Sequence, residues 1–133
     1  MSLLLQDLDG LGDITAERLR SSRYDRHVVE HVLTQLVQLA VAINSHVAAS
    51  VLGEAVTDYR SSFDAAARAG CLDPDVALRL QPSVGLRNVV VHEYLDVDVE
   101  VVAAAAGAAR QDYAAYVRSV AGWLTERAKG RSG

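Results

Sequence analysis

Within nine consecutive residues, from Leu86 to Tyr94, the sequence gathers side chains that could act together on a phosphodiester. A guanidinium, an amide, an imidazole and a phenol follow one another here, on Arg87, Asn88, His92 and Tyr94. An imidazole titrates near neutral pH, so it can take a proton from a ribose 2′-hydroxyl or give one to a leaving oxygen. A guanidinium can stabilise the charge that develops on phosphate oxygens. These residue types suit RNA cleavage without a metal ion.

One helix carrying these residues would make a poor site. Asn88 and His92 lie one turn apart and share a face, but Arg87 and His92 diverge by about 140° at 100° per residue. Two such helices crossing at a twofold axis would make a better site, which favours a homodimer with the motif at its interface. The spacing alone leaves a structural alternative open, in which Arg87 and His92 simply pair with Glu93, Asp96 or another acid.

A second motif, from His27 to His31, matches the inverted zinc-protease pattern His-x-x-Glu-His. On a helix both imidazoles would share a face, and Glu30 could polarise a metal-bound water. The intervening valines, however, belong to an apolar helical stripe, and no third ligand is marked. We therefore expect histidines on a helix surface and no metal site.

The elements that must position the first motif are predicted to be helices. From Tyr24 onward apolar residues recur at the spacing of a long amphipathic helix, with Gly53 as its stop: Val29, Val32, Leu33, Leu36, Leu39, Ala40, Ile43 and Val47. A shorter helix is expected over residues 58–69, closed by Gly70. Asp73 and Pro74 are an N-cap and a first-turn proline, which start another helix.

Pro82 interrupts that helix, and a final long helix is expected after Asp98. The β-branched residues 89–91 and the alternating residues 97–101 also fit a strand pair, but helical signals flank them on both sides. We therefore predict an all-α protein, an antiparallel up-and-down bundle of four main helices plus a short N-terminal helix. Residues 1–133 form one domain, with 129–133 as a frayed tail.

Composition narrows the class of protein further. The chain has 133 residues, half of them hydrophobic, and a formal net charge of −4, which argues against a dedicated nucleic-acid coat. The lone Cys71 excludes an internal disulfide and favours a reducing cytoplasm. No run reads as a membrane span of about 20 apolar residues or as a signal peptide. Four arginines in residues 18–26 are interpreted as a solvated helix face, interleaved with acids.

The stretch Arg-Asn-x3-His-Glu-Tyr-Leu, preceded by Gly-Leu, resembles the signature of HEPN-domain toxins of the HepT family. These small all-α proteins carry an Arg-x4-His-x-Tyr motif. Residues 29–51, with Asn-Ser-His at 44–46 near their end, also resemble the long second helix of the family, and residues 58–63 and 69–72 resemble its third helix and turn. The resemblance covers about residues 25–127, whereas residues 1–22 match less well.

The resemblance implies a metal-independent ribonuclease toxin that acts as a homodimer, with the two motifs facing across the interface. Such toxins are paired with a minimal nucleotidyltransferase antitoxin, MntA, which blocks them by attaching AMP to the motif tyrosine. By position, Arg87 and His92 would be catalytic, Asn88 would support them and Tyr94 would be modified, with RNA as substrate and no cofactor. The alternative is a non-catalytic interaction module that scaffolds a nucleotidyltransferase partner.

Overall fold

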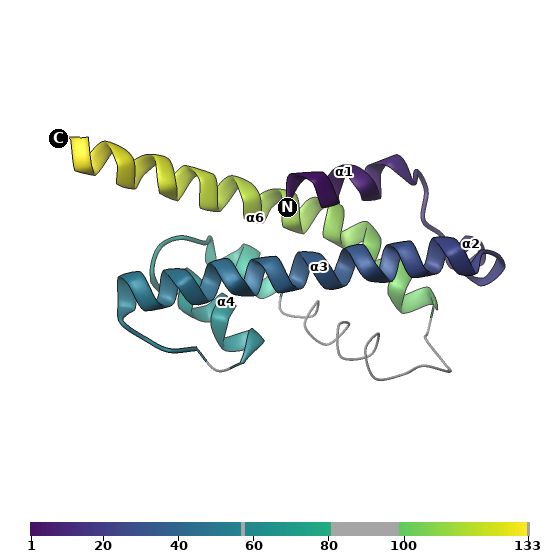
Figure 1. Ribbon diagram of the computed structural model, residues 1–133, viewed down its shortest axis with the longest axis horizontal. Coiled ribbons are helices and arrows are strands. Elements are labelled where there is room, and N and C mark those ends of the chain that lie inside the picture. The colour runs from purple at the N-terminus through teal and green to yellow at the C-terminus, as the bar shows by residue number, and fades with distance from the viewer. Residues whose placement is uncertain (57, 81–98, 133) are drawn as a thin grey trace.

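The computed structural model describes residues 1–56, 58–80 and 99–132 of the chain. Within these ranges every regular element is a helix, and they pack around one long central helix (Figure 1). The all-α class predicted from the sequence is confirmed.

The N-terminal region folds as two short helices instead of the single one expected. Helix α1 spans Ser2–Gly10 and helix α2 spans Ala16–Ser21. Gly12, with a φ of 71°, turns the chain between them. The Thr15 side chain then accepts a hydrogen bond from the Arg18 backbone N–H, which caps α2. Both helices pack against α3 and α6, so this region belongs to the core of the domain.

Helix α3, Arg23–Val47, is the central helix, and Ser22 caps its N-terminus. Most of the predicted stripe is buried, but Leu39 is 39% exposed, while Val37 and Asn44 are buried in addition. After α3 the chain continues as a π-helix, η1, over Ala48–Leu52. This helical stretch ends at Gly53, whose φ is 66°. The expected stop is therefore confirmed. The wider turns of η1 alter the helical register, so the stripe cannot be extended to the end at 100° per residue.

Helix α4, Tyr59–Arg68, begins where the sequence predicted. The Asp58 carboxylate caps it by accepting from the backbone N–H and the hydroxyl of Ser61, at 2.8 and 2.7 Å. Gly70 follows the helix with a φ of 84°, the left-handed conformation expected of it. Residues 74–80 are helical, and Asp73 accepts a hydrogen bond from the backbone N–H of Asp75 at their start.

Helix α6, Val99–Ser132, is the longest element described. Its first turn contains Val99 and Val101, so this part of the alternative strand reading is wrong; residues 89–91, like Pro82, lie outside the described residues. The helix as described runs to Ser132, across residues 129–132 of the predicted tail. Its last turns project beyond the other helices (Figure 1).

A polar network lies inside the otherwise apolar core. The Tyr116 hydroxyl is 2.7 Å from Asn44 Oδ1 and 3.1 Å from the Ala40 carbonyl oxygen. Asn44 Nδ2 donates to the Ser62 hydroxyl at 3.3 Å, and that hydroxyl donates to the Tyr59 carbonyl at 2.7 Å. Asn44, Ser62 and Tyr116 are almost completely buried. The network therefore joins α3, α4 and α6 by directional bonds, which fixes their relative register.

By length and composition alone, the continuous helical stretch Arg23–Leu52 could cross a bilayer, with a mean hydropathy of 1.4 over its most apolar window. In the structure this stretch is the central helix, and 44% of that window is buried inside the protein. Its buried face packs against the other described helices. The apolar character is accounted for by the core of the bundle.

Candidate functional site

The predicted motif residues Arg87, Asn88, His92 and Tyr94 lie outside the described residues, as does Glu93. What the structure gives is the frame at the two ends of this segment. Leu80, the last described residue before this segment, and Val99, the first described residue after it, are both buried. Both belong to the main hydrophobic cluster, so the described helices on either side of the segment are anchored in the core at these two residues.

Next to the first anchor lies a hollow of about 590 Å³ with a cationic lining. Arg79 contributes from the helical residues 74–80, and the rest of the lining comes from one side of α6: Arg110, Gln111, Asp112, Ala114, Ala115 and Arg118. The two alanines are short, which opens space between the longer side chains. We call these seven residues the arginine groove.

Two of its three guanidinium groups have partners. Arg79 Nε lies 3.2 Å from Asp112 Oδ1, in an ion pair that links the helical residues 74–80 to α6. Arg110 donates to the carbonyl oxygens of Leu8, at 2.6 Å, and of Gly12, which ties α1 and the turn after it to α6. Arg79 and Arg110 therefore hold the walls of the groove in place.

Arg118 is exposed, as Arg79 is, but it differs from both because it makes no hydrogen bond or ion pair with the described residues. The groove near Arg118 is also lined by the short side chains of Ala114 and Ala115. The lining as a whole carries three guanidinium groups and one carboxylate, a formal charge of +2 on a chain whose net charge is −4. The groove is thus a local positive site on an acidic protein.

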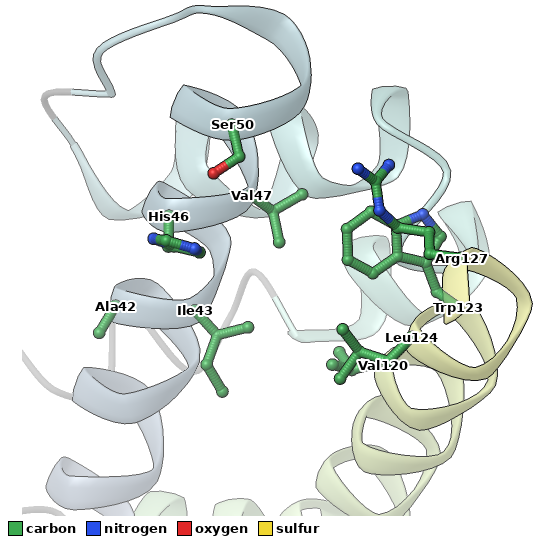
Figure 2. A pocket seen from close by; sticks show the side chains of 9 residues that line it. All are labelled: Ala42, Ile43, His46, Val47, Ser50, Val120, Trp123, Leu124 and Arg127. Carbon is green, nitrogen blue, oxygen red and sulfur yellow. The ribbon is translucent and has the colours of Figure 1, made fainter. Parts of the chain in front are cut away.

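A second hollow, of about 510 Å³, lies between the C-terminal parts of α3 and α6 and has a mostly apolar lining. Figure 2 shows Ile43 and Val47 directed toward Val120 and Leu124 across it. At one end the Arg127 guanidinium lies 4.7 Å from the centre of the Trp123 ring, a cation–π contact. The polar members of this mostly apolar lining are His46, Ser50 and Arg127.

The structure tests the alternative zinc motif directly. His27 and His31 do line the same hollow, as expected for one helix face. Glu30, however, is engaged by Arg26 at 3.7 Å and lies 4.0 Å from His27 Nδ1. No group of three histidine, cysteine, aspartate or glutamate side chains in the described part of the chain could hold a metal ion. Arg26, His27 and Glu30 thus form a group of ion pairs on α3, and His31 is exposed on the same helix.

The arginines near the N-terminus also have partners, as the sequence analysis expected. Arg18 pairs with Asp25 at 2.9 Å and Arg20 with Glu100 at 3.0 Å. Arg23 donates to His27 Nε2 at 3.3 Å. This cluster is a set of local contacts on and between helices, and it leaves the arginine groove as the more available cationic surface.

The tyrosines and the lone thiol of the described residues differ in how far they are buried. Tyr113 and Tyr116 are each 1% exposed, whereas Tyr24 is 76% exposed. Burial raises the pKa of the Tyr116 phenol far above its ordinary value, and it also raises the pKa of the Cys71 thiol. Neither group is therefore ionised at neutral pH, and Cys71 is a small apolar core residue.

The arginine groove was missed by the sequence analysis. Part of its signal is present in the sequence, since Arg110, Ala114 and Arg118 recur every four residues along the predicted final helix. The contribution of Arg79 could not be found in this way, because it comes from another element and meets α6 only through tertiary packing.

The chain matches the family model described as "Ribonuclease HepT-like" over residues 1–120. It is 32% identical over 121 residues to the tRNA nuclease HepT of Aphanizomenon flos-aquae (strain 2012/KM1/D3), covering 90% of this chain and 82% of that protein. The family-model match includes residues 1–22, where the resemblance seen in the sequence alone is weaker.

The fold is similar to a solved structure of a tri-AMPylated Shewanella oneidensis HEPN toxin in complex with an MNT antitoxin. The TM-score is 0.74 at 19% sequence identity, and the similarity covers 89% of this chain and 86% of that one. The family match over nearly the whole chain, together with this common fold, shows that the protein belongs to the HepT-like ribonuclease family.

Proposed function

We propose that this protein is the ribonuclease toxin of a toxin–antitoxin pair. The observation that carries the proposal is its 32% identity, over 90% of the chain, to a tRNA nuclease of the HepT family. The residues that such chemistry needs are present in this sequence at Arg87 and His92. The substrate is RNA, and the cytoplasm, where RNA and a reduced Cys71 coexist, is the compartment.

In the proposed reaction His92 transfers the proton and Arg87 stabilises the phosphate. The imidazole takes the proton of a ribose 2′-hydroxyl, whose oxygen attacks the adjacent phosphorus. The bond from phosphorus to the 5′-oxygen of the next nucleotide breaks, and the imidazolium returns the proton to that oxygen, which leaves a 2′,3′-cyclic phosphate. Arg87 balances the extra negative charge on the phosphate oxygens in the transition state, and Asn88 orients the imidazole or the phosphate. All groups come from the protein, so no metal ion or cofactor is required.

The experiment that tests this function is RNA cleavage by the purified protein in excess EDTA. We expect cleavage of transfer RNA at an unchanged rate after chelation, because the side chains supply both the base and the positive charge. Activity that is lost with EDTA and restored by a divalent metal would contradict the metal-free mechanism. Absence of cleavage, with binding of a nucleotidyltransferase retained, would favour the scaffold alternative.

We further propose that AMP attached to Tyr94 by an MntA-like nucleotidyltransferase neutralises the toxin. The modification would place a phosphate beside Arg87, where it competes with RNA for the guanidinium, and its bulk would fill the site. The fold limits which other phenols could react, because Tyr113 and Tyr116 are buried and cannot be reached by a second enzyme, whereas Tyr24 is exposed.

Co-expression with the transferase should add one or more units of about 329 Da to the protein, located by peptide mass spectrometry. Tyr94→Phe should stay unmodified and resist neutralisation, whereas Tyr24→Phe, which removes an exposed phenol elsewhere, should be modified as the parent is. Modification at Tyr24 or Tyr59, or neutralisation of Tyr94→Phe, would contradict this mechanism.

A further inference from the structure

We propose that the arginine groove is a binding site for the phosphate backbone of the RNA, with Arg118 as its principal contact. The inference rests on the proposed ribonuclease function and extends it to a surface outside the motif. It assigns a substrate-binding role to residues on α6, about which the Arg-x4-His pattern says nothing.

The charge of the arginine groove favours binding of RNA. A nucleic-acid backbone is bound mainly through its phosphates, and a protein of net charge −4 needs a local positive surface to attract them. The seven lining residues supply a formal charge of +2, or +1 when Asp9, whose Oδ1 lies 3.7 Å from Arg110 Nε, is counted with them. The N-terminal arginine cluster does not provide an equivalent surface, because Arg18 and Arg20 already pair with Asp25 and Glu100.

The three guanidinium groups of the groove differ in whether they are free to bind a phosphate. Arg79 and Arg110 hold the walls, through Asp112 and through the carbonyl oxygens of Leu8 and Gly12. Arg118 has no partner among the described residues, so its donors can form a forked contact to a phosphate without breaking a bond in the protein.

The spacing of the arginines along α6 suits an extended RNA strand. Arg110 and Arg118 are eight residues apart, about 12 Å along a helix that rises 1.5 Å per residue, and the short Ala114 and Ala115 lie between them. An extended strand can therefore approach the helix between the two arginines. Gln111 adds an amide that can bond to a ribose hydroxyl or a phosphate.

The groove and the motif are close together along the chain. Arg79 is eight residues before Arg87 in the sequence, so chain length alone keeps their Cα atoms within about 28 Å of each other. An RNA of several nucleotides can span this distance. A strand bound in the groove can thus extend to the site where the motif acts.

The test is RNA binding by the homogeneous protein, measured by fluorescence anisotropy of a labelled single-stranded RNA over a range of salt concentrations. A His92→Ala background prevents cleavage during the titration. Arg118→Ala should weaken binding about tenfold and reduce the slope of log K against log salt by about 0.7, the effect of losing one phosphate contact. Arg60→Ala is the matched control, because Arg60 is an exposed arginine on α4, outside the groove.

A second variant gives a gain of affinity, which cannot come from misfolding. Asp112→Asn removes the carboxylate beside Arg79 and should tighten RNA binding about threefold. Asp64→Asn, which removes a carboxylate paired with Arg68 on α4, should change affinity less.

The parent protein separates the two claims. If it cleaves RNA and Arg118→Ala binds RNA with the affinity and salt slope of Arg60→Ala, the groove inference is wrong and the ribonuclease function stands. If the parent does not cleave RNA but binds it in an Arg118-dependent way, the groove inference stands and the ribonuclease function is wrong. Weakened binding of a protein partner by Arg118→Ala, with RNA binding unchanged, would also overturn the inference.

Discussion

At the scale of single residues, the buried hydroxyl of Tyr116 is the clearest stabilising contact in the described core. It bonds to Asn44 Oδ1 at 2.7 Å, and Asn44 in turn is completely buried. Tyr116→Phe would leave that amide oxygen without a donor, at a cost of about 1–3 kcal/mol in the free energy of unfolding. Urea denaturation should show this loss, while Tyr24→Phe, on a 76% exposed ring, should unfold at the parent's midpoint. Equal midpoints for all three proteins would contradict the role given to the network.

The same residue makes stability depend on alkaline pH. Burial raises the pKa of Tyr116 in the folded protein above its ordinary value of 10.0, so the folded state favours the neutral phenol. The stabilisation is complete below pH 10 and is lost progressively as the pH rises above it, because the unfolded chain then releases the proton more readily. Thermal unfolding from pH 8 to 11 should show this fall, and Tyr116→Phe should fall less steeply. A parallel fall in both proteins would contradict the assignment to Tyr116.

At the scale of elements, the turn at Gly70 depends on a left-handed backbone. Its φ is 84°, and a Cβ at this position would meet no other atom, so Gly70→Ala tests the backbone conformation alone. We expect a loss of about 1 kcal/mol in the free energy of unfolding. Gly122→Ala is the matched control, since Gly122 lies in α6 with equally open space, and alanine should stabilise that helix by about 0.5–1 kcal/mol. Equal effects of the two substitutions would contradict this explanation.

The helices themselves could be predicted well from the sequence, because their start and stop signals are local. Asp58, Asp73 and Gly70 act in the structure as their chemistry predicts. The misplaced details depend on packing. Leu39 is partly exposed and Asn44 is buried, because the Ser62 and Tyr116 partners of Asn44 come from other helices. The π-helical turns of η1 likewise have no local signature that the apolar spacing could reveal.

At the scale of the whole molecule, the account requires two copies of the chain. On one helix Arg87 and His92 would diverge by about 140°, which makes a poor site, so we expect the motifs of two protomers to form a composite site. Light scattering at micromolar concentration should give about twice the chain mass of 14.3 kDa. A stable monomer that cleaves RNA would contradict the composite site.

The motif can be picked out of the sequence, and the roles of its residues stay a prediction, whereas the surroundings of the candidate site could not be predicted. The Arg87–His92 pattern is visible in nine consecutive letters of the sequence, whereas the arginine groove depends on Arg79 meeting α6 across the fold. The net charge of −4 argues against RNA binding when it is taken as one number. Its distribution over the surface, which only the fold reveals, removes that conflict.

The most direct test of the central claim compares two histidine variants in one RNA-cleavage assay. His92→Ala removes the proton-transfer group and should slow cleavage by a factor of about 10² or more, with the helical circular dichroism unchanged. His31→Ala removes an exposed imidazole of the zinc-like motif and should cleave at the parent's rate. If His92→Ala cleaves RNA as fast as the parent, or if His31→Ala is the inactive protein, the function proposed for this chain is contradicted.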